Sequence, residues 1–146
     1  MPDTTTLLRA PQRHVFVYGT LRRGQCNDIT LLRPAPRHIG MARVPGRLYH
    51  LGAYPGLVLD AGTPSGNWVV GEVYAIAPVL EPQLDVIEGI LPCPNGEYAK
   101  RSVAVLVDAE RIDCLVYEVN PGFYDEARRI ERGDWLHGAP FFHETR

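Results

Sequence analysis

The 146-residue sequence has few cysteines: Cys26, Cys93 and Cys114 are odd in number and widely spaced. A disulfide framework needs paired cysteines, and a zinc site needs ligands at short fixed spacings, so the pattern argues against both. The five histidines also lack HExxH or any other ligand spacing. We therefore expect reduced thiols, no metal and a cytoplasmic protein.

Long hydrophobic runs and an excess of charge are also missing. No apolar run approaches the ~20 residues that cross a bilayer. The first 13 residues are polar and contain two prolines, unlike a secretory signal. The formal net charge of −2 provides no basic surface for nucleic acid or an anionic membrane. The sequence thus predicts a soluble protein that binds neither.

Several common catalytic motifs are absent. There is no Gly-x-Ser-x-Gly elbow. Gly19 and Gly24 have the spacing of a phosphate-binding loop, but Gln25 and Cys26 replace the required Lys and Ser or Thr. Cys93 lies in a loop with flanking prolines, although scattered thiols are more typical of structural or surface cysteines. We expect neither a nucleotide triphosphatase nor a serine hydrolase.

Glycine (14) and proline (13) are abundant, which favours many turns and short elements. The length fits one domain, expected over 14–146 after a flexible tail at 1–13. Alternating and apolar runs predict strands at 14–18, 38–44, 46–51, 56–60, 67–76, 98–107 and 111–119. Helical spacing and caps predict helices after residue 27, at 80–88 and at 125–132. The expected fold class is α+β, a small closed mixed β-barrel of six or seven short strands with two or three flanking helices.

The first predicted strand ends in a loop that is a candidate binding site. Because glycine permits a tight turn and close approach, a β run that stops at Gly19 can present backbone N–H groups to a ligand. The same pattern also fits an ordinary strand-ending turn. Arg22 and Arg23, which follow in the loop, are expected to be solvated.

Two carboxylates are unusual in their context. Glu72 lies in a strand that is apolar on both faces, which favours a hydrogen-bonded structural residue over a site residue. Asp85 and Glu88 share a helix face. Glu88 stands at the helix C-terminus, where the negative end of the macrodipole raises the pKa of a carboxyl group. Glu88 is therefore either a candidate base or a surface residue beside the Gly89 cap.

An ordered set of short motifs runs along the chain over about residues 14 to 135. The segments are Val17-Tyr18-Gly19-Thr20-Leu21-Arg22-Arg23-Gly24, Gly46-Arg47-Leu48-Tyr49, Tyr54-Pro55-Gly56, Gly71-Glu72-Val73-Tyr74, Leu84-Asp85-x-x-Glu88-Gly89, Tyr98, Val116-Tyr117 and Ile130-x-x-Gly133-Asp134-Trp135. Together they resemble the gamma-glutamylcyclotransferase-like family, whose signature is the Tyr-Gly-Thr-Leu loop. A single such loop is weak evidence, whereas the ordered set is specific.

The resemblance implies a small β-barrel with a cavity at one end and no cofactor. It places the catalytic glutamate at Glu88. The substrate-binding residues that it implies are Tyr18, Gly19, Thr20, Leu21 and Tyr98. Family members often have Tyr-x-Arg where this chain has Tyr98-Ala99-Lys100-Arg101, so a bidentate contact from that basic side chain is in question.

The activity that the resemblance implies is a gamma-glutamyl cyclotransferase. A gamma-glutamyl amine or related small-molecule substrate would release 5-oxoproline by attack of its own α-amine, with Glu88 as general acid and base. Two alternatives stay open: a non-catalytic small-ligand-binding or interaction domain of the same fold, and hydrolysis or acyl transfer with Glu88 activating water. The oligomeric state is open as well, although Trp135, Phe141 and Phe142 are expected to cover the barrel or form a contact.

Overall fold

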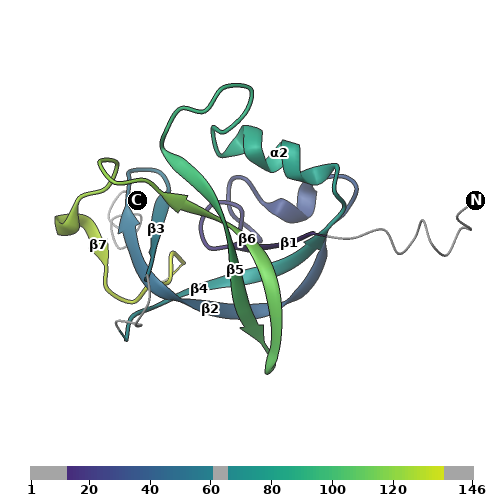
Figure 1. The fold of residues 1–146 in the computed structure, drawn as a ribbon, viewed down its shortest axis with the longest axis horizontal. Coiled ribbons are helices and arrows are strands. Elements are labelled where there is room, and N and C mark those ends of the chain that lie inside the picture. Colours follow the sequence, from purple (N-terminus) through teal and green to yellow (C-terminus); the bar gives the residue numbers. More distant parts are fainter. Residues whose placement is uncertain (1–12, 61–65, 137–146) are drawn as a thin grey trace, which may run out of the picture.

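The computed structural model describes residues 13–60 and 66–136, which form a closed five-stranded barrel with two further strands (Figure 1). Around the barrel the strands run in the order β1 (Arg13–Val17), β4 (Trp68–Ile76), β2 (Arg37–His50), β3 (Pro55–Leu59) and β6 (Glu110–Val119). Parallel pairing of β6 with β1 closes the ring, and β3 also pairs with β6 in parallel. The other pairs are antiparallel, so the predicted closed mixed barrel is confirmed.

Two further strands lie outside the five-stranded ring, and each pairs with one strand of the ring. β5 (Tyr98–Val107) forms an antiparallel hairpin with β6 through Asp108 and Ala109, whose positive φ values of 49° and 69° are those of a two-residue hairpin turn. β7 (Arg129–Ile130) pairs with β2. In the described chain the seven strands match the predicted number.

The chain has one α-helix among its described residues, α2 (Leu80–Ile87), which lies on the opposite side of β1 from β2 and β4 (Figure 1). The other two predicted helices are single 3₁₀ turns, η1 (Ile29–Leu31) and η2 (Glu126–Arg128). Asp28 caps η1 as expected, because its side chain accepts a hydrogen bond from the Thr30 N–H group. The predicted helix at 125–132 is wrong.

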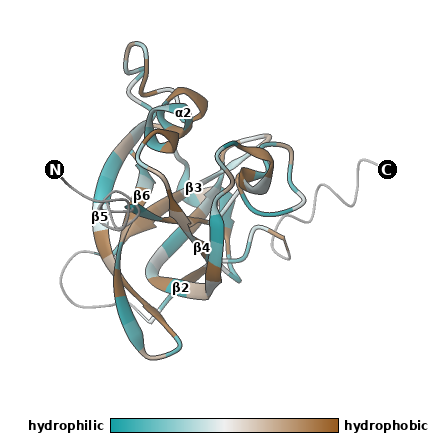
Figure 2. Cartoon of the chain, turned by 90° about the vertical axis from the view of Figure 1, so that its right-hand side faces the viewer, coloured by the Kyte–Doolittle hydropathy of each residue, from teal (hydrophilic) through white to brown (hydrophobic). Residues whose placement is uncertain are grey.

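The buried apolar side chains form two separate cores. Along the strands, hydrophobic and hydrophilic segments alternate (Figure 2). One core fills the barrel and includes Phe16, Leu48, Val73 and Trp135. The other lies between the barrel and α2, and is built on the outward-facing side chains of the same strands. β4 contributes to both cores, which explains why its sequence is apolar on both faces.

The predicted division into strands at 38–44 and 46–51, with a turn at Pro45-Gly46 between them, is also wrong, because β2 is one continuous strand of 14 residues. At Pro45-Gly46 β2 exchanges β4 for β3 as its neighbour, and a residue without an N–H group is tolerated there. Gly46 serves close approach: a Cβ would lie 2.6 Å from the Val58 carbonyl oxygen. Proline and glycine here mark a change of partner strand.

The C-terminal segment is extended because Ile130 is needed in the barrel core, where it pairs with Leu48. Trp135 is 3% exposed in that same core, so it covers the barrel interior. Phe141 and Phe142 lie outside the described residues. The same holds for residues 1–12 of the predicted tail, whereas Arg13 already belongs to β1.

We predict that Gly133→Ala destabilises the fold far more than Gly122→Ala. Both glycines have positive φ, 65° and 94°, so alanine strains the backbone in either case. A Cβ at Gly133 would in addition overlap the Trp68 carbonyl oxygen, whereas one at Gly122 meets nothing within 4 Å. Urea unfolding should show a loss of about 1–2 kcal/mol for Gly122→Ala and about 3 kcal/mol or more for Gly133→Ala. Equal losses would contradict the proposed close packing.

Candidate functional site

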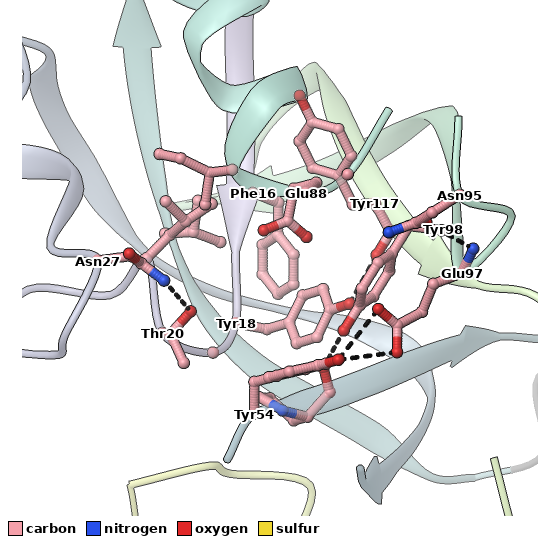
Figure 3. Close-up of a pocket in the computed structure, with 16 residues that line it drawn as sticks. Phe16, Tyr18, Thr20, Asn27, Tyr54, Glu88, Asn95, Glu97, Tyr98 and Tyr117 are labelled. Carbon is pink, nitrogen blue, oxygen red and sulfur yellow. Dashed lines mark hydrogen bonds between the residues drawn. The ribbon is translucent and has the colours of Figure 1, made fainter. Parts of the chain in front are cut away.

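A cavity of about 300 Å³ opens where the two cores meet (Figure 3). This is the lower end of the size range of small-molecule sites. Its lining residues are Phe16, Val17, Tyr18, Gly19, Thr20, Leu21, Asn27, Tyr54, Pro55, Ile87, Glu88, Gly89, Asn95, Glu97, Tyr98 and Tyr117. The structure thus brings together all six predicted site residues, which come from the β1 loop, the end of α2 and the start of β5.

The loop after β1 presents backbone N–H groups along one wall of the cavity. The carbonyl groups of Gly19, Thr20 and Leu21 accept hydrogen bonds from later backbone N–H groups at 2.9–3.0 Å. Within the described chain, the N–H groups of these three residues donate to no acceptor. A Cβ at Gly19 would lie 2.6 Å from Pro55. The loop is therefore held from its carbonyl side, and its donors are free for an anionic ligand.

Arg22 ties this loop to Glu72 and Asp134, and the prediction that its side chain is solvated is wrong. The side chain is 3% exposed and donates to Glu72 at 3.0 Å and to Asp134 at 2.9 Å. Glu72 also accepts from the Arg23 N–H group and the Tyr74 hydroxyl, which confirms its structural role. Sequence reasoning missed the burial because the acceptors are 50 and 112 residues away.

Glu88 is delivered to the cavity by the way α2 ends. Gly89 has a φ of 75°, its N–H group bonds to Val86, and the Ile90 N–H group bonds to Asp85. These are the two hydrogen bonds of a Schellman motif, with Glu88 as the last helical residue before the glycine. Figure 3 shows the carboxyl group pointing into the cavity above Phe16.

The Glu88 carboxyl group has no hydrogen bond or ion pair within the described chain. Burial raises its pKa from 4.5 to about 7, and the negative charge of Glu97 adds to the shift. A raised pKa agrees with the expectation from the helix macrodipole, but the main cause of the shift is desolvation of the carboxyl group. At neutral pH the group can therefore both take up and release a proton.

Three residues fix the orientation of α2. Asp85 accepts a hydrogen bond from the Tyr117 hydroxyl at 2.7 Å and an ion pair from Lys100 at 3.0 Å. Lys100 also pairs with Glu81. Lys100 therefore does not line the cavity; it ties β5 to the helix that carries Glu88. Neighbouring Arg101 pairs with Glu118.

The tyrosine hydroxyls in the cavity already donate to backbone oxygens. Tyr98 donates to Pro55 at 2.7 Å, and Tyr18 donates to Tyr117 at 2.6 Å while accepting from Leu57. Burial raises the pKa of both phenols well above their usual value, so they stay neutral. Toward a ligand they can act as hydrogen-bond acceptors, which suits an ammonium group.

Sequence reasoning missed a second carboxylate, Glu97, together with Tyr54 and Asn95. Glu97 accepts from the Tyr54 hydroxyl at 2.9 Å and 3.0 Å, and its N–H group bonds to the Asn95 side chain. The one available signal was the position of Glu97 directly before Tyr98. In an exposed loop rich in proline and glycine, that position alone could not distinguish a site residue from a solvated one.

No group of three His, Cys, Asp or Glu side chains among the described residues could hold a metal ion. No helix in the same residues is long and apolar enough to cross a membrane.

Comparison with known proteins gives a consistent family. The family model described as "Gamma-glutamyl cyclotransferase, AIG2-like" matches residues 15–137. A Vibrio cholerae protein named "Putative gamma-glutamylcyclotransferase" is 42% identical over 128 residues, covering 85% of this chain and 96% of its own. A rat gamma-glutamylaminecyclotransferase is 29% identical and covers 71% of this chain and 76% of its own.

A solved structure also resembles this fold. The solution structure of YtfP from Escherichia coli superposes with a TM-score of 0.56 at 30% sequence identity, covering 85% of this chain and 96% of its own.

We predict that Arg22→Ala lowers the free energy of unfolding by about 3–5 kcal/mol, because it leaves the buried Glu72 and the half-buried Asp134 without their cation. The matched control is Arg23→Ala. The Arg23 side chain is exposed, so its loss should change stability by less than about 0.5 kcal/mol. Urea unfolding at neutral pH measures both, and similar losses in the two variants would disprove the role of Arg22.

We predict that the buried Glu88 makes the protein less stable as pH rises from about 4.5 to about 7. In this window the folded protein keeps the Glu88 proton while the unfolded chain has lost it, so deprotonation favours unfolding. The contribution is at most ~3 kcal/mol. Unfolding free energies at pH 4 and pH 8 should therefore differ between wild type and Glu88→Gln by this amount, with the variant relatively more stable at pH 8. An identical pH dependence would contradict the raised pKa.

Proposed function

Because the chain belongs to the gamma-glutamyl cyclotransferase, AIG2-like family, we propose that it releases 5-oxoproline and a free amine from a gamma-glutamyl amine or a related gamma-glutamyl compound. A cyclotransferase-like enzyme is what the family and its named relatives support. The observation that carries the finer proposal is the Glu88 carboxyl group, which has no partner among the described residues and lines the same cavity as the β1 loop, whose N–H groups are free.

The reaction needs little more than folding of the substrate and movement of protons. The α-amine attacks the side-chain carbonyl carbon, a C–N bond closes the five-membered lactam, and the original amide C–N bond breaks. Attack within one molecule gives a large effective molarity when the reacting atoms are held together. The α-ammonium loses two protons in all, and the departing amine gains two as it leaves as an ammonium ion.

Glu88 is the group proposed to carry these protons. A pKa of about 7 matches the requirement that one group accept a proton from the α-ammonium and return it to the departing nitrogen. The ammonium also finds acceptors in the hydroxyl oxygens of Tyr98 and Tyr18, which already donate elsewhere. This arrangement holds the amine near Glu88 before it is deprotonated.

The N–H groups of Gly19, Thr20 and Leu21 are proposed to bind negative charge. The substrate α-carboxylate is one candidate, and the oxyanion of the tetrahedral intermediate is the other. Removal of one such donor typically costs ~10²–10³-fold in rate. A binding domain without catalysis would use the same loop, but the buried and unpartnered carboxyl group favours the enzyme, since a ligand-binding role does not need a proton carrier.

We predict that Glu88→Gln lowers the rate of 5-oxoproline formation by ~10²–10⁴-fold, because glutamine has the same shape but can neither accept nor release a proton near neutral pH. Purified protein is incubated with a panel of gamma-glutamyl amines and dipeptides, and 5-oxoproline is measured by mass spectrometry. Glu131→Gln, which removes an exposed carboxylate outside the cavity, should behave like wild type.

The pH profile adds a second readout to this test. For the wild type, kcat/KM should rise through a pKa near 7 as Glu88 ionises. Full turnover by Glu88→Gln would disprove its role, whereas no turnover of any panel member by the wild type would disprove the proposed reaction.

A further inference from the structure

The cavity carries two carboxylates and no basic side chain. Glu88 and Glu97 lie among its lining residues, and none of those residues is Lys, Arg or His. The basic side chains next to lining residues along the chain are Arg22, Arg23, Lys100 and Arg101. Arg22, Lys100 and Arg101 are paired with carboxylates outside the cavity, and the Arg23 side chain is exposed. Two negative charges in one small cavity without a compensating cation indicate that the cation arrives with the ligand.

Glu97 is held rigidly enough to act as a recognition group. Its carboxylate accepts from the Tyr54 hydroxyl at 2.9 Å and 3.0 Å, and its N–H group is tied to Asn95 at 2.9 Å. Its carbonyl oxygen also accepts from the Asn120 N–H group at 2.8 Å. A carboxylate has about four acceptor positions, and one phenol proton satisfies a single one. The remaining capacity of Glu97 is available to a donor in the cavity.

The electrostatic environment around Glu97 agrees with this geometry. Burial is the largest cause of the raised pKa values of Glu88, Tyr54 and Tyr98. The negative charge of Glu97 raises all three further, and the charge of Glu88 also raises those of the two tyrosines. No basic residue contributes to any of these three shifts. The field at the Tyr54 side of the cavity is therefore negative, and it favours a bound cation.

The glutamyl part of a gamma-glutamyl compound has no charged group left to pair with Glu97. The substrate's α-carboxylate is assigned to the N–H groups of the β1 loop, and its α-ammonium is assigned to Glu88. A neutral departing group would bring no counter-charge to Glu97. A departing amine that carries a second ammonium group would do so, and its alkyl chain would lie along the Tyr54 and Tyr98 rings, whose centres are 6.4 Å apart.

We propose that Glu97, together with Tyr54, forms a cation subsite that selects gamma-glutamyl derivatives of diamines over those of simple alkyl amines. The inference rests on the proposed cyclotransferase reaction and extends it to the departing group. Glu97 is here a specificity-determining residue, and Glu88 remains the proton carrier.

The test compares two substrates that differ in one terminal group, N-gamma-glutamyl-1,4-diaminobutane and N-gamma-glutamyl-butylamine. We expect wild type to prefer the diamine derivative by ~10–100-fold in kcat/KM, as for a hydrogen bond between charged groups. In Glu97→Gln, which keeps an acceptor for Tyr54, the preference should fall to within about 3-fold. Glu131→Gln, outside the cavity, should keep the wild-type preference. Assays at pH 8.5 keep Glu88 ionised and the terminal amine protonated.

Each outcome decides the proposal. Equal kcat/KM for the two substrates in wild type, or an unchanged preference in Glu97→Gln, would overturn the cation subsite and leave the cyclotransferase reaction intact. If neither substrate yields 5-oxoproline, the reaction fails, and calorimetry with 1,4-diaminobutane and butylamine alone decides the subsite. Selective binding of the diamine that is lost in Glu97→Gln would support it, and no selectivity would overturn it.

Discussion

The site depends on one costly arrangement, the Glu88 carboxyl group in the cavity wall, which has no hydrogen-bonding or charged partner among residues 13–60 and 66–136. In water the pKa of Glu88 would be near 4.5; in the cavity it is about 7, because the anion loses hydration that no donor replaces. Such a group is destabilising to the fold when ionised, so the surrounding structure must hold it in place. The Schellman end of α2 and the Asp85 contacts supply that constraint.

The other buried carboxylates show what full compensation looks like. Glu72 accepts from Arg22, the Arg23 N–H group and Tyr74, and Asp85 accepts from Lys100 and Tyr117. Both hold elements together, and neither lines the cavity that contains Glu88. Glu72 and Asp85 are buried and have several partners each, whereas Glu88 is half-buried at the cavity wall and has no partner among the described residues. This difference explains why a pattern in the sequence could not decide between the two readings of Glu88.

Local sequence patterns predicted the features that depend on neighbouring residues in the chain. Strand alternation, the two strands at 98–107 and 111–119 and the helix end at Gly89 were found because each depends on a few adjacent residues. The errors share a different cause. Pro45 was read as a turn because only the tertiary structure reveals the change of neighbouring strand, and Arg22 was read as solvated because its acceptors are distant in the chain. Glu97 was missed for the same reason, since its partner Tyr54 belongs to another loop.

The three-residue spacing between Asp85 and Glu88 has a physical basis in this structure. Lys100 and Tyr117 are cross-strand partners on β5 and β6, and both reach Asp85, so this side of α2 is fixed against the hairpin. Successive residues of an α-helix are rotated by about 100°, so residues three apart lie on the same side of the helix, and fixing Asp85 also fixes the direction of Glu88. Lysine suits its place because a compact charge can bridge Glu81 and Asp85, whereas arginine favours a single planar pairing. Lys100 thus fixes the direction of α2, the helix that carries Glu88, without lining the cavity.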